Sequence, residues 1–290
     1  MNKLPTRRRA RILNLLVEGM SMRAITRLEG VGINTVSRLL TAAGKAARKH
    51  HNDNVWGIAG RRVIECDEVW SFVYAKQKNA PWVPKPAGDI WTFSALDTES
   101  KLVISYLVGS RTKKFATALM DDLYWRLEER PQITTDGLQA YVKAVKKVYG
   151  RDVDFAQTVK QYDPTGRRRS RAVRLDYPTS DFIDRRSIAG QPDMDRASTS
   201  YIERSNLTIR MCNRRFTRKT NAFSKSLAQH KASVHLYFLW YNFCRIHRSL
   251  GTTPAVESGM DDRVRDLRWL VELIDARTPP PKRPKHYKKR

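Results

Sequence analysis

The sequence predicts an α/β protein in which a mixed five-stranded sheet, flanked by helices, follows an all-helical N-terminal domain. Two patterns lead to this prediction. Residues 7–44 are basic and show helical spacing of apolar side chains, whereas residues 62–162 alternate strand-like and helix-like segments. We therefore expect one domain over residues 1–50, the sheet domain over 51–255, and a C-terminal helix and tail over 256–290.

Three short helices are expected in the N-terminal domain. The apolar positions at helical spacing, expected to point inward, are Leu13, Leu16, Met22, Ile25, Leu28, Val36, Leu39 and Leu40. Ser21 can cap the second helix, a tight turn follows at 30–32, and Asn34 or Thr35 opens the third helix. Two helices joined across a glycine turn are typical of a helix-turn-helix, and residues 21–40 resemble that motif in bacterial regulators and recombinases. A plain three-helix bundle is the alternative.

The sheet domain is expected to begin with a strand within residues 62–74, which are rich in β-branched and aromatic side chains. Two further strands are joined by a turn at 97–100, and a helix follows over 113–129. A short strand then ends at Asp136, a helix runs through Val145, and residues 153–162 form the fifth strand.

The segments after the fifth strand are more polar and more helical. Residues 163–200 are expected to form a loop or insertion, which contains the basic run at 166–175. Residues 201–247 are helical and aromatic, and residues 262–276 form a short amphipathic helix. The tail at 278–290 is rich in Pro, Lys and Arg, and it either holds DNA electrostatically or only increases solubility.

The charge of the chain points to a polyanionic partner. The sequence has 55 Lys+Arg against 29 Asp+Glu, a formal net charge of +26, which favours phosphate binding through counterion release. Anionic membrane surface is a rival partner, and ribosomal or chromatin proteins share this bias. The sequence contains no run of about 18 apolar residues, so we do not expect a transmembrane helix. Three widely spaced cysteines without a CxxC pair support neither a zinc knuckle nor a disulfide framework, so we expect a cytoplasmic, nucleoid-associated protein.

Acidic residues interrupt the predicted strands at two places. Asp67 lies inside the first strand and Asp136 at the end of the fourth, and an acid within a strand is costly to bury unless it binds something. Glu65 shares a strand face with Asp67 and is the alternative to it, while Glu68 points the other way. Asp136 precedes Gly137 and could instead cap the next helix.

A third acid, Glu203, lies on a predicted helix. Asn206, Arg210 and Arg214 follow it at three- and four-residue steps, which forms one polar stripe. The neighbouring apolar stripe, expected to pack on the sheet, consists of Ile202, Ile209, Cys212 and Phe216. A glutamate beside an amide and two guanidiniums suits a metal ligand next to groups that grip phosphate. Glu203 could also be a solvated acid paired with Arg204 or Arg210.

Four runs of the sequence resemble the InsB-type DDE transposases of bacterial insertion sequences. They are ECDEVW at 65–70, TTDG at 134–137, YIERSNLTIRMCNRRFTRKTNAFSKS at 201–226 and YNFCRIHRSLGTTPA at 241–255. The resemblance implies the RNase H-like core of transposases and retroviral integrases, in which the first and fourth strands lie side by side. Asp67 and Asp136 would then meet although they are 136 − 67 = 69 positions apart.

The resemblance also implies that Asp67, Asp136 and Glu203 are catalytic residues and the ligands of two Mg²⁺ or Mn²⁺ ions. Adjacent carboxylates repel each other unless a divalent cation neutralises them, and hard oxygen ligands suit these ions. One ion would bridge Asp67 and Asp136 and the other Asp67 and Glu203, in a two-metal phosphoryl transfer where the 3′-OH freed by hydrolysis attacks target DNA. The interval from Asp136 to Glu203, 203 − 136 = 67 positions, is longer than in many members of the superfamily.

The partners that the resemblance implies are double-stranded DNA, as transposon ends and as target, and further copies of the chain in a homo-oligomeric synaptic complex. The residues expected at the DNA are Arg23, Asn34, Thr35, Ser37, Arg38, Asn206, Arg210, Arg214 and Arg215. Two alternatives stay open. One is a helix-turn-helix regulator with a non-catalytic integrase-like domain, and the other is a metal-dependent nuclease without strand transfer. His230 and His247 are given no role.

Overall fold

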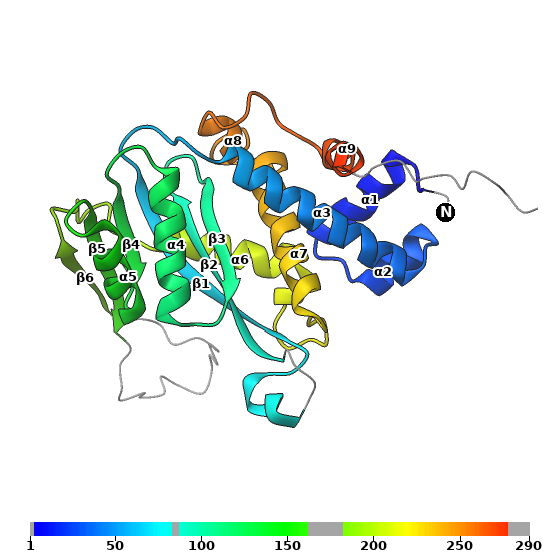
Figure 1. Ribbon diagram of the computed structural model, residues 1–290, viewed down its shortest axis with the longest axis horizontal. Coiled ribbons are helices and arrows are strands. Elements are labelled where there is room, and N and C mark those ends of the chain that lie inside the picture. The colour runs from blue at the N-terminus through cyan, green and yellow to red at the C-terminus, as the bar shows by residue number, and fades with distance from the viewer. Residues whose placement is uncertain (1–2, 83–86, 162–181, 278–290) are drawn as a thin grey trace, which may run out of the picture.

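A six-stranded mixed sheet forms the centre of the computed structural model, which describes residues 3–82, 87–161 and 182–277 (Figure 1). Its strands are β1 (Val63–Val73), β2 (Gly88–Asp97), β3 (Val103–Gly109), β4 (Gln132–Asp136), β5 (Asp154–Gln161) and β6 (Phe182–Ala189). They lie in the order β3-β2-β1-β4-β5-β6. β1 pairs antiparallel with β2 and parallel with β4, so the first and fourth strands are neighbours, as the resemblance to RNase H-like proteins implied.

The prediction of a five-stranded sheet is wrong, because the sheet has a sixth strand. Residues 163–200 were expected to form a loop, but β6 lies within them and pairs antiparallel with β5 from Phe155↔Ala189 to Gln161↔Phe182. The strand adds an edge beyond the predicted sheet. The basic run at 166–175 lies outside the described residues.

Helices cover both faces of the sheet (Figure 1). The helices that follow the N-terminal region are α4 (Lys113–Arg126), α5 (Gln139–Tyr149), α6 (Ser200–Cys212), α7 (Leu227–Leu239), α8 (Pro254–Glu257) and α9 (Leu267–Arg277). α4 and α5 lie on one face, while α6 lies on the other and packs against β1 and β2. The helical region expected at 201–247 contains two α-helices, α6 and α7. The helix expected at 262–276 is present as α9, which begins five residues later, at Leu267.

The three expected N-terminal helices are present as α1 (Thr6–Val17), α2 (Met22–Glu29) and α3 (Ile33–Asn54). Ser21 caps α2 as predicted, since its side chain accepts a hydrogen bond from the backbone N–H of Ala24. α3 begins at Ile33, one residue before the expected start, and continues past residue 50. Leu28 was expected to point inward, but this prediction is wrong, because the residue is 58% exposed.

The N-terminal helices pack tightly on the rest of the molecule. α3 lies along α7 and α1 lies against α9, and their buried apolar side chains join those of the sheet in one core. Two glycines make this closeness possible. A Cβ on Gly19, in the turn after α1, would lie 2.4 Å from the carbonyl oxygen of Met211 at the end of α6. A Cβ on Gly44 would lie 2.5 Å from the Cα of Ala232, where α3 crosses α7.

Replacing Gly44 by Ala should destabilise the protein, although alanine raises helix propensity by about 1 kcal/mol. The added methyl group would meet the backbone of Ala232 and force α3 and α7 apart. We expect the free energy of unfolding to fall by about 1–3 kcal/mol, as for other overpacked helix contacts. Chemical denaturation measures it, and Lys45→Ala, at an exposed position on the same helix, should change it by less than about 0.5 kcal/mol. A more stable Gly44→Ala variant would contradict this packing.

Within the described part of the chain, we find no helix with the length and apolar character needed to span a bilayer. The tail at 278–290, expected to be a DNA clamp or a solubilising segment, lies outside the described residues.

Candidate active site

Asp67 and Asp136 lie side by side where the parallel pairing of the two central strands, β1 and β4, ends. The register of β1 and β4 runs from Val63↔Gln132 to Cys66↔Thr135, so Asp67 and Asp136 are the next residues on the two strands. The 69 positions that separate them in the sequence, 136 − 67, therefore do not separate them in space. The carboxyl end of β4 is also where the backbone N–H of Leu138 donates to Asp136 Oδ1, at 3.0 Å.

Glu68 is the third acid of this cluster, and the sequence did not indicate it. Oxygen atoms of Asp67, Glu68 and Asp136 all lie within 4.8 Å of one another. Strand alternation places Glu68 on the face opposite Asp67, where it accepts hydrogen bonds from Arg111 Nε at 2.6 Å and from the Tyr141 hydroxyl at 3.2 Å. The pairing of β1 with β4 ends at Cys66, so beyond that point both side chains can reach Asp136.

Burial and mutual repulsion make these carboxyl groups hard to ionise. Burial, followed by the charges of Glu68 and Asp136, raises the pKa of Asp67 to about 7. Burial also raises the pKa of Glu68 and the pKa of Asp136. Asp67 has no ion-pair partner among the residues that the structure describes. The cluster therefore holds negative charge at a cost that a bound cation would remove.

This cost predicts that Asp67→Asn stabilises the metal-free protein at alkaline pH. The pKa of Asp67 is about 7 in the folded protein and 3.8 ordinarily, so the carboxyl group favours folding below pH 4 and loses that contribution as the pH rises through 7. Asparagine cannot ionise. In chelator-treated samples, denaturation should show the variant more stable by up to about 4 kcal/mol at pH 8 and nearly equal to wild type near pH 4. If wild type and Asp67→Asn were equally stable at pH 8, ionisation of Asp67 would not destabilise the folded protein.

Glu203 faces the same cluster from α6 but is held by other groups. Lys160 Nζ, on β5, lies 2.6 Å and 2.7 Å from its two carboxylate oxygens, and the Thr199 hydroxyl donates to it at 2.8 Å. Glu203 does not belong to the three acids that converge within 4.8 Å. Its negative charge nevertheless adds to the rise in the pKa of Asp67 and of Asp136, after the larger effect of burial.

Asn206 connects α6 directly to Asp67. Its side chain is 5% exposed, and its Nδ2 donates to Asp67 Oδ2 at 2.8 Å. The sequence placed Asn206 at the DNA, whereas in the structure its amide holds a carboxylate of the acidic cluster. The contact fixes which oxygen of Asp67 remains free to accept another ligand.

Glu65, the alternative to Asp67 in the sequence, fastens the start of α6 to β1. Its carboxylate is fully buried and accepts the backbone N–H of Ile202 at 2.8 Å. Thr199, the residue before α6, makes no side-chain capping bond, so Glu65 supplies the acceptor that the first turn of the helix lacks. Burial raises the pKa of Glu65 to about 7. Because Glu203 follows Ile202, this contact also fixes the position of Glu203.

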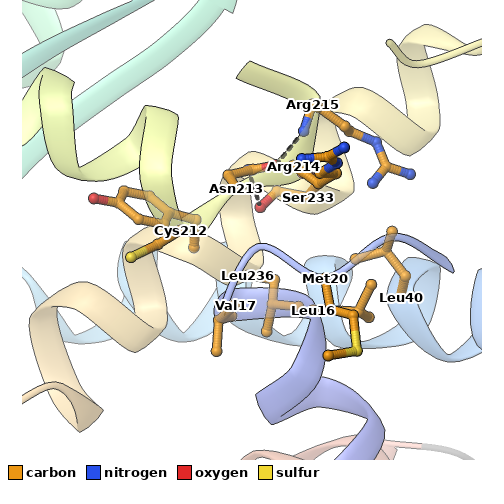
Figure 2. Close-up of a pocket in the computed structure, with 11 residues that line it drawn as sticks. Leu16, Val17, Met20, Leu40, Cys212, Asn213, Arg214, Arg215, Ser233 and Leu236 are labelled. Carbon is orange, nitrogen blue, oxygen red and sulfur yellow. Dashed lines mark hydrogen bonds between the residues drawn. The ribbon is translucent and has the colours of Figure 1, made fainter. Parts of the chain in front are cut away.

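The arginines after Glu203 divide into two groups. Arg210 lies on α6, but the helix ends at Cys212, so Arg214 and Arg215 are in a short 3-10 turn (Arg214–Phe216) and the predicted stripe stops at Arg210. Arg215 lies over a cavity of about 10 Å³ between this turn and α1 (Figure 2). Its Nη2 lies 3.6 Å from the sulfur of Met22, and burial lowers its pKa to about 10.

The N-terminal residues expected at the DNA lie at the start of α2, which carries Arg23, and in the first two turns of α3, which carry the four residues expected in the major groove. Arg23, Asn34 and Arg38 are exposed, while Thr35 and Ser37 are half-buried. Leu28 and Ile33 are also exposed beside them, at 58% and 44%. The turn therefore presents a mixed polar and apolar surface to solvent.

The two histidines and Cys66 have structural surroundings. His230 is fully buried between the hydroxyls of Ser71 and Ser224, and burial lowers its pKa to about 3. His247 contacts the carbonyl of Tyr241, and burial lowers its pKa to about 4. Burial raises the pKa of the Cys66 thiol, so it stays protonated and is not a nucleophile.

No protein-family model matches the sequence, and no curated protein matches it. Solved structures with some likeness include the piggyBac transposase synaptic complex with hairpin DNA, at 12% identity over 94% of this chain and 72% of that chain, with a TM-score of 0.37. Two others are the Mos1 transposase paired-end complex with left transposon end (15% identity, 52% and 58% coverage, TM-score 0.22) and the Mos1 mariner paired-end complex with Mn (10% identity, 95% and 80% coverage, TM-score 0.30). These TM-scores are low, so the functional conclusion is drawn from the acidic site itself.

Proposed function

We propose that this chain is a DDE-type transposase with an RNase H-like catalytic domain, which cuts DNA at the ends of a mobile element and joins them to a target. The observation that carries the proposal is the meeting of Asp67 and Asp136 where the pairing of the two central strands β1 and β4 ends, although these strands lie far apart in the sequence. The chain has a formal charge of +26, yet three carboxyl groups converge at this point. Clustered acids with raised pKa values are typical of functional sites.

The carboxylate oxygens that converge at this point fit a divalent metal ion. The converging atoms are all carboxylate oxygens, and the raised pKa values of Asp67 and Asp136 mean that a cation bound between them would be stabilising. Hard oxygen donors with open positions suit Mg²⁺ or Mn²⁺. We assign Asp67 and Asp136 as shared ligands and Glu203 as the third acid. Bound ions at this place would supply Lewis-acid stabilisation of the charge that develops on the phosphate oxygens.

The residues of the chain would arrange this chemistry. The Asn206 amide orients the Asp67 carboxylate, and Glu65 fixes the start of the helix that carries Glu203. Arg111 pairs with Glu68 at 2.6 Å and lies 4.0 Å from Asp136, so among the described residues Asp67 is the acid of the cluster that no protein cation neutralises. We place Glu68 in this supporting role and not among the ligands.

DNA recognition is assigned to the α2–α3 turn and to the basic surface. Asn34 and Arg38, exposed on α3 just after the turn, would contact bases and phosphates in a major groove, with Thr35 and Ser37 at the edge of the contact. Arg23, exposed at the start of α2, would contact the DNA from the neighbouring helix. The general positive charge would hold target DNA by its backbone. Since two element ends must be joined together, we propose that a homo-oligomer acts on them.

The test uses the DNA that flanks the gene. If inverted repeats border it, labelled duplexes that end in those repeats are incubated with the protein, Mg²⁺ and a target plasmid. We expect strand cleavage at the repeat end and covalent joining to the plasmid, both lost with a chelator. Cleavage without joining would identify a nuclease. Binding without cleavage would identify a regulator, which has no evident reason to keep three repelling carboxylates together.

A further inference from the structure

Lys160 makes a close cationic contact with Glu203, the acid that α6 contributes to the proposed site. Its ammonium group lies 2.6 Å and 2.7 Å from the two oxygens of Glu203, so a single cation engages both sides of the carboxylate. The two side chains are 34% and 41% exposed. The pair therefore lies at the open side of the site, where an incoming ligand can reach it.

The position of Lys160 follows from the sheet. Asp136 pairs with Thr158 on β5, and Lys160 is two residues further along the same face of that strand. Its charge opposes the rise that burial causes in the pKa of Asp136. Lys160 thus faces both Asp136 and Glu203, next to the point where Asp67 and Asp136 meet.

The other acids of the site are held differently. Asp67 receives the neutral amide of Asn206, Asp136 receives a backbone N–H, and Glu68 has Arg111. Glu203 is the acid whose two oxygens are both taken by a lysine, a flexible point charge that can move away without unfolding anything. A metal ion and this ammonium group would compete for the same oxygens.

We infer that Lys160 is an internal counter-ion of Glu203, displaced when Glu203 binds a divalent cation and then free to contact the phosphodiester. The inference rests on the proposed function. In the metal-free protein the ammonium group neutralises Glu203 and keeps it close to its ligand position. After displacement, the ammonium group would remain within reach of the metal ligands Glu203 and Asp136. The substrate phosphate would bind beside these ligands. Lysine is a common point-charge partner of phosphate.

Metal affinity separates this role from a merely structural one. In Lys160→Met the competing cation is gone, so Mn²⁺ should bind about two- to five-fold more tightly, the range expected for an exposed ion pair. Lys160→Arg should keep the wild-type affinity. Lys143→Met, at an exposed position on α5, is the matched control and should have no effect. Free Mn²⁺ is measured by electron paramagnetic resonance on the full chain without DNA.

A double-mutant comparison tests whether the effect passes through Glu203. In the Glu203→Gln background, Lys160→Met should no longer change Mn²⁺ affinity, because there is no carboxylate to compete for. Unchanged or weaker Mn²⁺ binding in Lys160→Met alone would overturn the inference, and so would an effect of Lys160→Met that persists in the Glu203→Gln background. Loss of Mn²⁺ binding in Asp67→Asn is tested in parallel. If Asp67→Asn binds Mn²⁺ normally, the metal site itself is wrong, whatever Lys160 does.

The phosphate contact has its own readout. With saturating Mg²⁺, Lys160→Met should lower kcat for end cleavage by about 10- to 100-fold, the cost of losing one hydrogen bond to a charged group, with little change in KM. Lys160→Arg should restore most of kcat. An unchanged kcat in Lys160→Met would exclude the contact, even if the metal affinity shifts as expected.

Discussion

Replacing Asp67 or Asp136 by Asn should abolish metal-dependent cleavage and joining while binding to the element ends persists. Each substitution keeps the size of the side chain and removes one negative charge from the point where Asp67, Glu68 and Asp136 converge. We expect rates to fall by about 10³-fold or more, because a lost ligand removes several kcal/mol of charge stabilisation and about 1.36 kcal/mol corresponds to a factor of ten. Initial rates on labelled ends measure the loss.

Binding and folding serve as controls for this experiment. Gel-shift affinity for the ends should stay near wild type, since the proposed recognition surface at the α2–α3 turn is not altered. Asp121→Asn, at an exposed acid on α4, removes the same charge away from the site and should leave cleavage unchanged. If Asp136→Asn kept more than about a tenth of the wild-type rate, the proposed pair of ligands would be wrong.

Glu203→Gln and Glu68→Gln should differ sharply, although each removes one carboxylate beside Asp67. Glu68 already has Arg111 and Tyr141 as partners, and a glutamine can accept from one and donate to the other. We expect Glu68→Gln to stay within about 10-fold of wild type, which corresponds to about 1.4 kcal/mol. Glu203→Gln should lower kcat on the order of 10²- to 10³-fold, as for the loss of a group that stabilises transition-state charge.

The number of bound Mn²⁺ ions gives an independent measure of the same assignment. Glu203→Gln should lose one of the two expected ions, whereas Glu68→Gln should keep both. The opposite pattern would make Glu68 the third ligand and leave Glu203 as the partner of Lys160 alone. Either result fixes the third acid without reference to any relative.

The central strands could be predicted because each has a clear apolar pattern, whereas the neighbouring positions of the first and fourth strands were implied only by the resemblance. β6 could not be predicted, because it lies at the sheet edge and pairs through its backbone with β5, so its side chains need not be apolar on both faces. Ile183 and Ile188 are 48% and 38% exposed, which is typical of such an edge. The polar sequence around them therefore indicated a loop.

Local patterns in the sequence mark only some of the acids that the structure brings together. Asp67 and Asp136 interrupt strand patterns, which marks them in the sequence. The roles of Glu65, Glu68 and Lys160 depend on contacts between distant segments and leave no local signal. The end of α6 was also missed, because Asn213 leaves the helix to bond with Ser233 on α7 (Figure 2).

The contact of Gly19 with the Met211 carbonyl ties the turn before α2 to the far end of the helix that carries Glu203. Under the proposed function, the surface that recognises DNA and the acids that cut it would then form a molecular ruler. One extra base pair between the recognised sequence and the cleavage point rotates the scissile phosphate by about 35° around the duplex, because about 10–10.5 base pairs make one turn. Such an enzyme would accept element ends of one spacing and reject those lengthened by a few base pairs.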